Sequence, residues 1–443
     1  MTHQKDFKQL VRARMKKTGE RYTAARAALI GTRSAGAAKT PSLFPGYTGT
    51  GGICRDTGAL RNFLEASGLR AAHSGEPLSE AMAFGLCGGV GFLYAVFEYK
   101  GWPPILSVLT RHDTMPDSFI AGGLLRLGVK IEVAETSSAG QAARSLAAAL
   151  DARRPALCVV DCLGMARAES TSPLQMSGAP TVVGVAGVDG EDLLLDDGGI
   201  DPRRMSKETF ARARALYKKG KHRLVTMAAP GAPVAIEPML NPVIAATADR
   251  FHNSPYKGFA ANFGFAGLDK WRGLMTDAKD KKGWPQLFPE GKLAYFGLRR
   301  THDGIETEFT APAAGRPLYA DFLREAATIT GNDRLRSAAE LFRLSGEHWS
   351  AISTAIAGCG DEAIEAGCRL GESAQEIIDE AGCPRAAELQ ALGEMRQSLA
   401  EQCRMTRDEA RNLYADLSSE VAAILALETE AVAILAPQVA RRN

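Results

Sequence analysis

Two kinds of hydrophobic pattern divide the chain near residue 230. Before that point, short apolar runs alternate with amphipathic segments of helical period. The apolar runs predict strands over residues 92–97, 105–109, 129–133, 156–161, 181–188, 192–195 and 222–227. The amphipathic segments predict helices over residues 55–67, 78–86, 119–127, 139–152 and 206–217. The dipeptide Asp189-Gly190 lies between two of the strands and predicts a hairpin turn.

After a cluster of prolines at positions 230, 233, 238 and 242, the strand signals fade. The remaining pattern predicts helices over residues 245–250, 258–274, 319–329, 333–344, 347–357, 362–381, 385–401 and 407–435. The sequence therefore predicts an α+β fold with three parts. These are an N-terminal arm and linker (1–50), a mixed α/β domain (51–230) and an α-helical domain (231–443).

The N-terminal arm combines basic and apolar residues at helical spacing over residues 7–29, and Gly19 interrupts the pattern. We expect an amphipathic helix that packs on the body of the protein or on a second copy. The long helix predicted over 407–435 could supply a further contact between copies, so we expect a homo-oligomer.

Composition excludes several classes of protein. The chain has 53 Lys and Arg against 51 Asp and Glu, a net charge of +2, so it lacks the basic character of a dedicated nucleic-acid binder. The longest uncharged apolar stretch, residues 81–97, contains four glycines and is shorter than the roughly 20 residues that a membrane span needs. Residues 1–10 contain no apolar run typical of a secretory signal, so we expect a cytoplasmic protein without membrane contact.

The eight cysteines contain no CxxC pair. Cys158 and Cys162 lie four residues apart in an apolar run without a second ligand pair, which argues against zinc. We expect no metal and no cofactor, and mostly reduced, buried thiols.

Cys54 is the most suggestive single residue. It follows Gly51-Gly52-Ile53 and opens the helix predicted over 55–67. A helix N-terminus stabilises a thiolate and a developing oxyanion, so the position suits a nucleophile, although a structural cysteine is the alternative. Arg55, the next residue, is a candidate substrate contact.

A cysteine nucleophile needs a base and a group that orients it. His112 follows the strand predicted over 105–109 and is the candidate base; the alternative is a loop histidine paired with Asp113 or Asp117. Asp197, beside Asp196 at the end of the second hairpin strand, is the candidate orienting acid, and capping of a turn is its alternative.

A glycine-rich stretch covers residues 85–91 and lies between a predicted helix and a predicted strand. A phosphate-binding loop has the opposite order and ends in Lys-Ser/Thr, so we interpret the stretch as a tight turn with close backbone packing. Gly88 and Gly89 are alternative candidates for a substrate groove.

The order of these features resembles the N-terminal domain of butirosin-biosynthesis protein H. The resemblance rests on three early motifs and one later motif. The early ones are Cys54 followed by Thr57-Gly58-Ala59-Leu60-Arg61-Asn62-Phe63-Leu64, then Leu78-Ser79-Glu80-Ala81, then Phe84-Gly85 with Gly88-Gly89-Val90-Gly91-Phe92. The later one is Met205-Ser206 with Phe210-Ala211-Arg212-Ala213-Arg214. Residues from about 258 to 350 are similar to the helical domain of unknown function that commonly follows it.

This resemblance implies a papain-like, bacteriocin-peptidase-like fold and an acyltransferase activity. The named family member moves an acyl group from a carrier-protein thioester to an amine of an aminoglycoside, which makes Cys54 the acyl acceptor by analogy. The family usually has a His at the start of the strand that ends in Gly-x-Asp. Here that strand begins Ala179-Pro180-Thr181-Val182 without a His, while the downstream acid is kept as Asp196 or Asp197.

Three hypotheses follow. The first is a cysteine-dependent acyltransferase or amide/thioester hydrolase that uses an acyl carrier protein or a peptide as partner. The second is a papain-like binding protein without turnover, which the missing His favours. The third is an assembly protein that acts through its terminal helices. We adopt the first, with Cys54, His112 and Asp197 as catalytic residues.

Overall fold

The computed structural model describes residues 14–16, 25, 43–113, 115–161, 165, 180–199, 202–227, 233–254, 256–379 and 386–436. The chain divides into two compact units that alternate along the sequence. The first is bounded by Met1–Cys87, Met115–Ile236 and Ala374–Ala391, and the second by Gly88–Thr114, Glu237–Ser373 and Leu392–Asn443. Most of the predicted N-terminal helix lies outside the described residues.

The first unit contains a six-stranded antiparallel sheet in the order β3-β8-β4-β5-β6-β7. Its strands are β3 (Ile131–Ala134), β4 (Ala156–Asp161), β5 (Pro180–Asp189), β6 (Asp192–Asp196), β7 (Arg203–Ser206) and β8 (Leu224–Met227). Every residue of β4 is buried, as its uninterrupted apolar sequence predicts for a central strand. The hairpin turn between β5 and β6 includes Gly190 in the left-handed region, with φ 63°.

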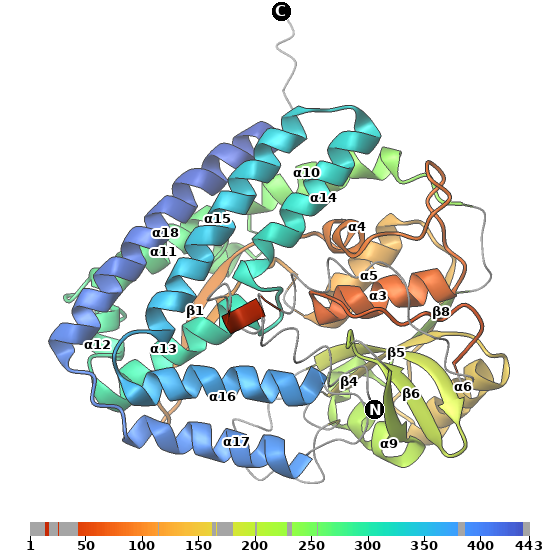
Figure 1. Ribbon diagram of the computed structural model, residues 1–443, viewed down its shortest axis with the longest axis horizontal. Helices are drawn as coiled ribbons and strands as arrows, with labels where there is room; N and C mark the ends of the chain where they lie inside the picture. The colour runs from red at the N-terminus through yellow and green to blue at the C-terminus, as the bar shows by residue number, and fades with distance from the viewer. Residues whose placement is uncertain are drawn as a thin grey trace, which may run out of the picture. The chain divides into compact units, whose positions relative to one another are not determined.

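Helices cover both faces of this sheet (Figure 1). They are α3 (Arg55–Ala66), α4 (Glu80–Leu86), α5 (Pro116–Arg126), α6 (Ala139–Asp151), α9 (Lys207–Leu216) and the short 3₁₀ turn η1 (Lys218–Gly220). Helices α6 and α9 pack on the face that carries Val183, Val185 and Leu195. Helix α3 packs against β5 on the opposite face, and it buries an apolar stripe that includes Leu60 and Phe63.

The second unit combines one β-hairpin with a helical bundle. Strands β1 (Leu93–Phe97) and β2 (Ile105–Leu109) pair antiparallel, with Leu93 opposite Leu109. The longer helices are α10 (Glu237–His252), α11 (Gly264–Thr276), α13 (Gly291–Glu306), α14 (Arg316–Thr330), α15 (Arg334–Ala357) and α18 (Arg407–Leu435). Shorter elements are η2 (Lys257–Asn262), α12 (Trp284–Leu287), η3 (Ala313–Gly315) and η4 (Leu399–Glu401). Helices α16 (Glu362–Asp379) and α17 (Ala386–Ser398) contain the points where the chain passes between the units.

The core of the second unit is built around aromatic rings. Helices α15 and α18 lie side by side along most of their length (Figure 1). Trp271, Trp284 and Trp349 are fully buried, and the rings of Trp271 and Trp349 stack with centroids 5.8 Å apart. None of the described helices is both long enough and apolar enough to cross a bilayer.

The structure confirms the predicted fold class: a region with strands and helices is followed by a mostly helical one. The limits at residues 50 and 230 stay a prediction, and the hairpin of residues 88–114 belongs to the same compact unit as the C-terminal helices.

The predicted elements differ from the structure in at least three places. Strand β7 and helix α13 were not predicted, although the structure contains both. The two helices expected over 333–344 and 347–357 form the single helix α15. Within α15, Gly346 packs closely against the ring of Pro317, where a Cβ would lie 3.1 Å from the proline.

Candidate functional site

Cys54 lies at the N-cap of α3, as the sequence predicts. Its backbone is extended, with φ −104° and ψ 123°, and the helix runs on for 12 residues. The residue is not part of a disulfide and is 2% exposed. The N-terminus of a helix favours negative charge, so this position suits a thiolate or an oxyanion formed beside it.

The chain before Cys54 forms a tight elbow, which we define as residues 51–54. A Cβ on Gly52 would lie 2.6 Å from the Cα of Gly58, so the elbow and the first turn of α3 touch through their backbones. The N–H of Gly52 donates to the carbonyl of Gly198 over 2.8 Å. Arg61 donates to the carbonyl of Thr50 over 2.5 Å. Two of these contacts come from α3 itself and the third from Gly198, after β6, and together they hold the chain around Cys54.

Glu80 completes the support of the elbow. It follows Ser79, whose hydroxyl caps α4 by accepting the N–H of Met82 over 2.9 Å. Its carboxylate accepts the N–H of Ile53 over 2.8 Å and the N–H of Cys54 over 2.7 Å. Burial raises the pKa of Glu80, and these N–H donors act against the rise.

Asp197 and Arg55 lie close to the elbow. The Asp197 carboxylate pairs with Arg203 at 2.6 Å and with Arg55 at 3.7 Å. A Cβ on Gly198 would lie 2.6 Å from the Cα of Arg55, so the segment after β6 packs against the start of α3. The structure thus gathers three predicted site residues, Cys54, Arg55 and Asp197, in one unit.

The neighbouring acid, Asp196, is fully engaged elsewhere. One of its oxygens accepts the hydroxyl of Tyr47 over 2.5 Å and the side-chain amide of Asn62 over 2.6 Å. The other accepts the N–H of Gly198 over 2.8 Å. Burial raises the pKa of Asp196, and the bonds from Tyr47 and Asn62 oppose the rise. Asn62 is eight residues beyond Cys54, so about 12 Å along α3 separates the two positions.

Strand β5 shows why the family's histidine has no equivalent here. Side chains alternate between the two faces of a strand. Val183 and Val185 belong to the core under α6 and α9. Thr181 is two residues before Val183, so it lies on the same face. Pro180, Val182 and Gly184 then point towards α3, in agreement with the 2.9 Å between a Gly184 Cβ and the Tyr47 hydroxyl. At the start of β5, the side chains of Pro180, Val182 and Gly184 thus offer no proton acceptor.

His112, the predicted base, lies in the second unit, and Cys54 lies in the first. Its ring meets the Phe251 ring edge to face, with centroids 5.3 Å apart. The residue is 8% exposed, and neither ring nitrogen has a hydrogen-bond partner among the described residues. Burial, with smaller effects from Arg250 and Arg316, lowers the pKa of His112 to about 3, so the imidazole is neutral at physiological pH.

Gly88 and Gly89 also belong to the second unit. The carbonyl of Gly88 accepts the hydroxyl of Thr247 over 3.1 Å. A Cβ on Gly89 would lie 2.4 Å from the Tyr319 ring. Both glycines have positive φ, so they form the tight, closely packed turn that the sequence favoured. A role in substrate binding stays a prediction for both.

Sequence reasoning missed Glu80, Tyr47 and Asn62 as parts of the site. Glu80 had a local signal, because an acid directly after an N-cap serine in an otherwise apolar run needs a partner. Tyr47 and Asn62 had none, since their common partner Asp196 is 149 and 134 residues away.

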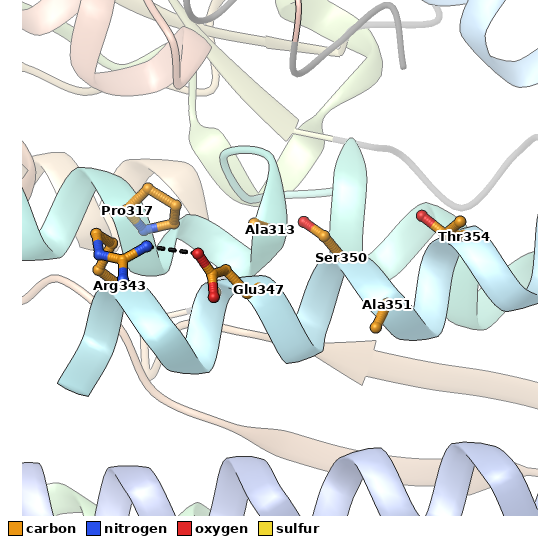
Figure 2. A pocket seen from close by; sticks show the side chains of 8 residues that line it. Ala313, Pro317, Arg343, Glu347, Ser350, Ala351 and Thr354 are labelled. Carbon is orange, nitrogen blue, oxygen red and sulfur yellow. Dashed lines mark hydrogen bonds and ion pairs between the residues drawn. The ribbon is translucent and has the colours of Figure 1, made fainter. Parts of the chain in front are cut away.

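The described part of the second unit also has an open groove of about 520 Å³ (Figure 2). Its lining residues are Ala313, Pro317, Arg343, Gly346, Glu347, Ser350, Ala351 and Thr354. Its charges are paired, because Arg343 donates to both Glu347 and Glu340. It contains none of the predicted site residues. Within the described ranges, no three His, Cys, Asp or Glu side chains are arranged to hold a metal ion.

The fold and the site define a protein in which a cysteine at a helix start, in a mixed α/β region, is followed by a helical region. Comparison with family models agrees with this layout. Residues 54–198 match butirosin biosynthesis protein H, N-terminal, and residues 208–381 match a domain of unknown function (DUF4872). The chain therefore carries the biosynthesis-associated N-terminal domain of that family, and the sequence resemblance is confirmed. No curated protein matches the chain.

Proposed function

We propose that this protein is a cysteine-dependent acyltransferase, or an amide or thioester hydrolase, of secondary metabolism. The observation that carries the proposal is the position of Cys54 at the start of α3, in an elbow held by Glu80, Arg61 and Gly198. A papain-like arrangement is part of the proposal. The match to a domain named for butirosin biosynthesis supports a role in secondary metabolism. The donor in this proposal is a carrier-bound acyl group or a peptide.

The reaction has two steps. The Cys54 sulfur attacks the carbonyl carbon of the donor thioester, and a new carbon–sulfur bond forms as the donor's carbon–sulfur bond breaks. The departing thiol takes up the proton that Cys54 gives up. An amine, or water, then attacks the acyl carbon, and Cys54 leaves with a proton as the thiol. Arg55, whose side chain is 26% exposed beside Asp197, is our candidate contact for the substrate.

The reaction also needs a group that accepts the Cys54 proton. His112 stays the predicted base, but a general base works best with a pKa near the operating pH, and that of His112 is about 3. Asp197 stays the predicted orienting acid, in competition with its ion pair to Arg203.

One observation favours a second candidate function, a binding protein without turnover. The Asp196 carboxylate, the other candidate for the acid that the resemblance implies, is satisfied by Tyr47, Asn62 and the Gly198 N–H. Because all of these donors are neutral groups of the protein itself, Asp196 then has a structural role. It would hold a peptide or a carrier-borne group for a partner enzyme.

Intact-mass spectrometry after incubation with acyl-pantetheine thioesters separates the two functions. We expect an acyl adduct on the wild-type protein and on the matched control Cys158→Ala, which removes another buried cysteine of the first unit. We expect none on Cys54→Ala. Absence of an adduct from all three proteins, with Cys54 still open to alkylation, would refute the acyl-enzyme. The binding function predicts instead that Cys54→Ala leaves ligand affinity unchanged.

A further inference from the structure

Glu80 is a buried carboxylate bound to the nucleophile's own backbone. It is 7% exposed and accepts three hydrogen bonds, from the N–H of Ile53, the N–H of Cys54 and, over 3.2 Å, the hydroxyl of Thr57. Hydrogen bonds to an ionised acceptor are stronger than neutral ones. Glu80 comes from α4, 26 residues beyond Cys54, so it links two elements at the site.

These bonds change which groups can stabilise an oxyanion. The sequence led us to expect backbone N–H groups at the start of α3 in that role. Since the N–H groups of Ile53 and Cys54 already donate to Glu80, they are committed to a negative charge that is present before any substrate binds. The expected donors at this end of α3 are therefore the N–H groups of the helix itself, from Arg55 on, and the N–H of Cys54 could serve only if Glu80 were displaced.

The same carboxylate acts on the thiol through its charge. Covalent geometry keeps the Cys54 sulfur within about 4 Å of its own nitrogen, and hence within about 7 Å of the Glu80 oxygen that accepts this N–H. A negative charge at that range opposes ionisation of the thiol, while the N-terminus of α3 favours it.

We propose that Glu80 is a positioning residue for Cys54: its carboxylate fixes the elbow through two backbone N–H groups, and its negative charge restrains the reactivity of the thiol. The assignment rests on the proposed role of Cys54 as nucleophile. It concerns a residue to which the family match gives no function.

Other charged groups near the elbow come from α3 and from the segment after β6. On α3 these are Arg55, Asp56 and Arg61; Arg61 favours the ionised form of Glu80. Asp196 ends β6, Asp197 follows it and Arg203 begins β7; Asp197 is paired with both Arg55 and Arg203. Because Arg61 also donates to the carbonyl of Thr50, loss of the Glu80 charge leaves a cation beside the elbow.

The test is the pH profile of Cys54 alkylation by iodoacetamide, followed by mass spectrometry of the peptide that contains Cys54. This reaction needs no acyl donor, so its outcome is independent of whether the acyl adduct forms. In Glu80→Gln we expect the midpoint of the profile to fall by about one pH unit, which is about a tenfold faster reaction below the midpoint. Glu76→Gln removes an exposed carboxylate four residues away and should leave the midpoint unchanged.

Glu80→Asp separates position from charge. It keeps the charge but shortens the side chain, so one of the two N–H bonds is lost. We expect a wild-type midpoint and a severalfold faster plateau rate at high pH, because the elbow opens. Alkylation of Cys158, buried in β4, reports on unfolding of the first unit.

A wild-type midpoint in folded Glu80→Gln would overturn the role of the charge. If Cys158 becomes reactive in Glu80→Gln, that variant has unfolded and Glu80→Asp decides. A wild-type plateau rate in Glu80→Asp would then overturn the positioning role.

Discussion

The buried ion pair of the second unit gives the sharpest stability prediction. Arg316 and Glu428 are both 0% exposed. Glu428 accepts two bonds from Arg316, over 2.8 and 3.0 Å, and further bonds from Ser345 and Trp349. Removing one partner of a buried pair leaves an uncompensated charge, which costs about 3–5 kcal/mol. We therefore expect Glu428→Gln to destabilise the second unit by that amount.

Replacing both partners by apolar residues often restores the stability of a protein with a buried ion pair. Here we expect no recovery, because Arg316 also donates to the carbonyls of Gly91, Thr110 and Ala314, over 3.0, 2.8 and 2.9 Å. The Thr110 carbonyl keeps a hydrogen bond from the N–H of Gly91 over 2.9 Å. A buried acceptor that loses its donor costs about 1–3 kcal/mol, so the carbonyls of Gly91 and Ala314 together cost roughly 2–6 kcal/mol. The double variant Arg316→Met with Glu428→Leu should therefore be no more stable than Glu428→Gln.

Urea unfolding followed by tryptophan fluorescence measures this unit directly. All four tryptophans of the chain, at positions 102, 271, 284 and 349, lie within its bounds. Asp269→Asn, which breaks an exposed pair with Arg272, is the matched control and should leave the midpoint unchanged. A double variant as stable as wild type would refute the argument from the carbonyls of Gly91 and Ala314, and a Glu428→Gln variant as stable as wild type would refute the assigned cost of breaking the ion pair.

Two further predictions use the same signal. His112 has a folded pKa of about 3 against an ordinary value of 6.5, so the unfolded chain binds its proton first as the pH falls. The stability due to neutral His112 is complete above pH 6.5 and falls by about 3 kcal/mol by pH 4. His112→Leu should lose less stability than wild type between pH 7 and 4, and equal losses would contradict the assigned pKa. Gly304→Ala should destabilise by about 1–3 kcal/mol, because its Cβ would lie 2.1 Å from the Val108 carbonyl oxygen. Gly273→Ala, in α11 with nothing within 4 Å of the added Cβ, should stabilise by about 0.5–1 kcal/mol, and similar effects at both glycines would refute the packing argument.

The elements that the sequence did not predict are those whose pattern depends on distant partners. Helix α13 buries Thr301, His302 and Asp303, so it has no simple polar face. Asp303 is buried because Arg396, 93 residues further on, donates to it over 2.6 Å. Strand β7 is four residues long and exists through its pairing with β6, in which Met205 lies opposite Leu193. Local periodicity contains neither kind of information.

The site, like the fold, was predictable only where local sequence determines it. The position of Cys54 at a helix start follows from local sequence, because an apolar helical pattern begins directly after it. The absence of a histidine at the start of β5 is also visible in the sequence. The sequence alone does not say which residue of β5 faces α3. The sheet register does: Thr181 faces the core under α6 and α9, so the residues that a base would have to replace are Pro180 and Val182.

This register also accounts for Asp196. Its partner across the sheet is Gly184, and the absence of a side chain there leaves room for the Tyr47 hydroxyl. Tyr47 and Asn62 donate to the same oxygen of Asp196, and the N–H of Gly198 donates to the other. The buried acid thus has its hydrogen bonds without a base, so its presence in the sequence is not evidence for one. Evidence for catalysis rests on Cys54 itself, and the acyl adduct and its alkylation profile are the measurements that decide it.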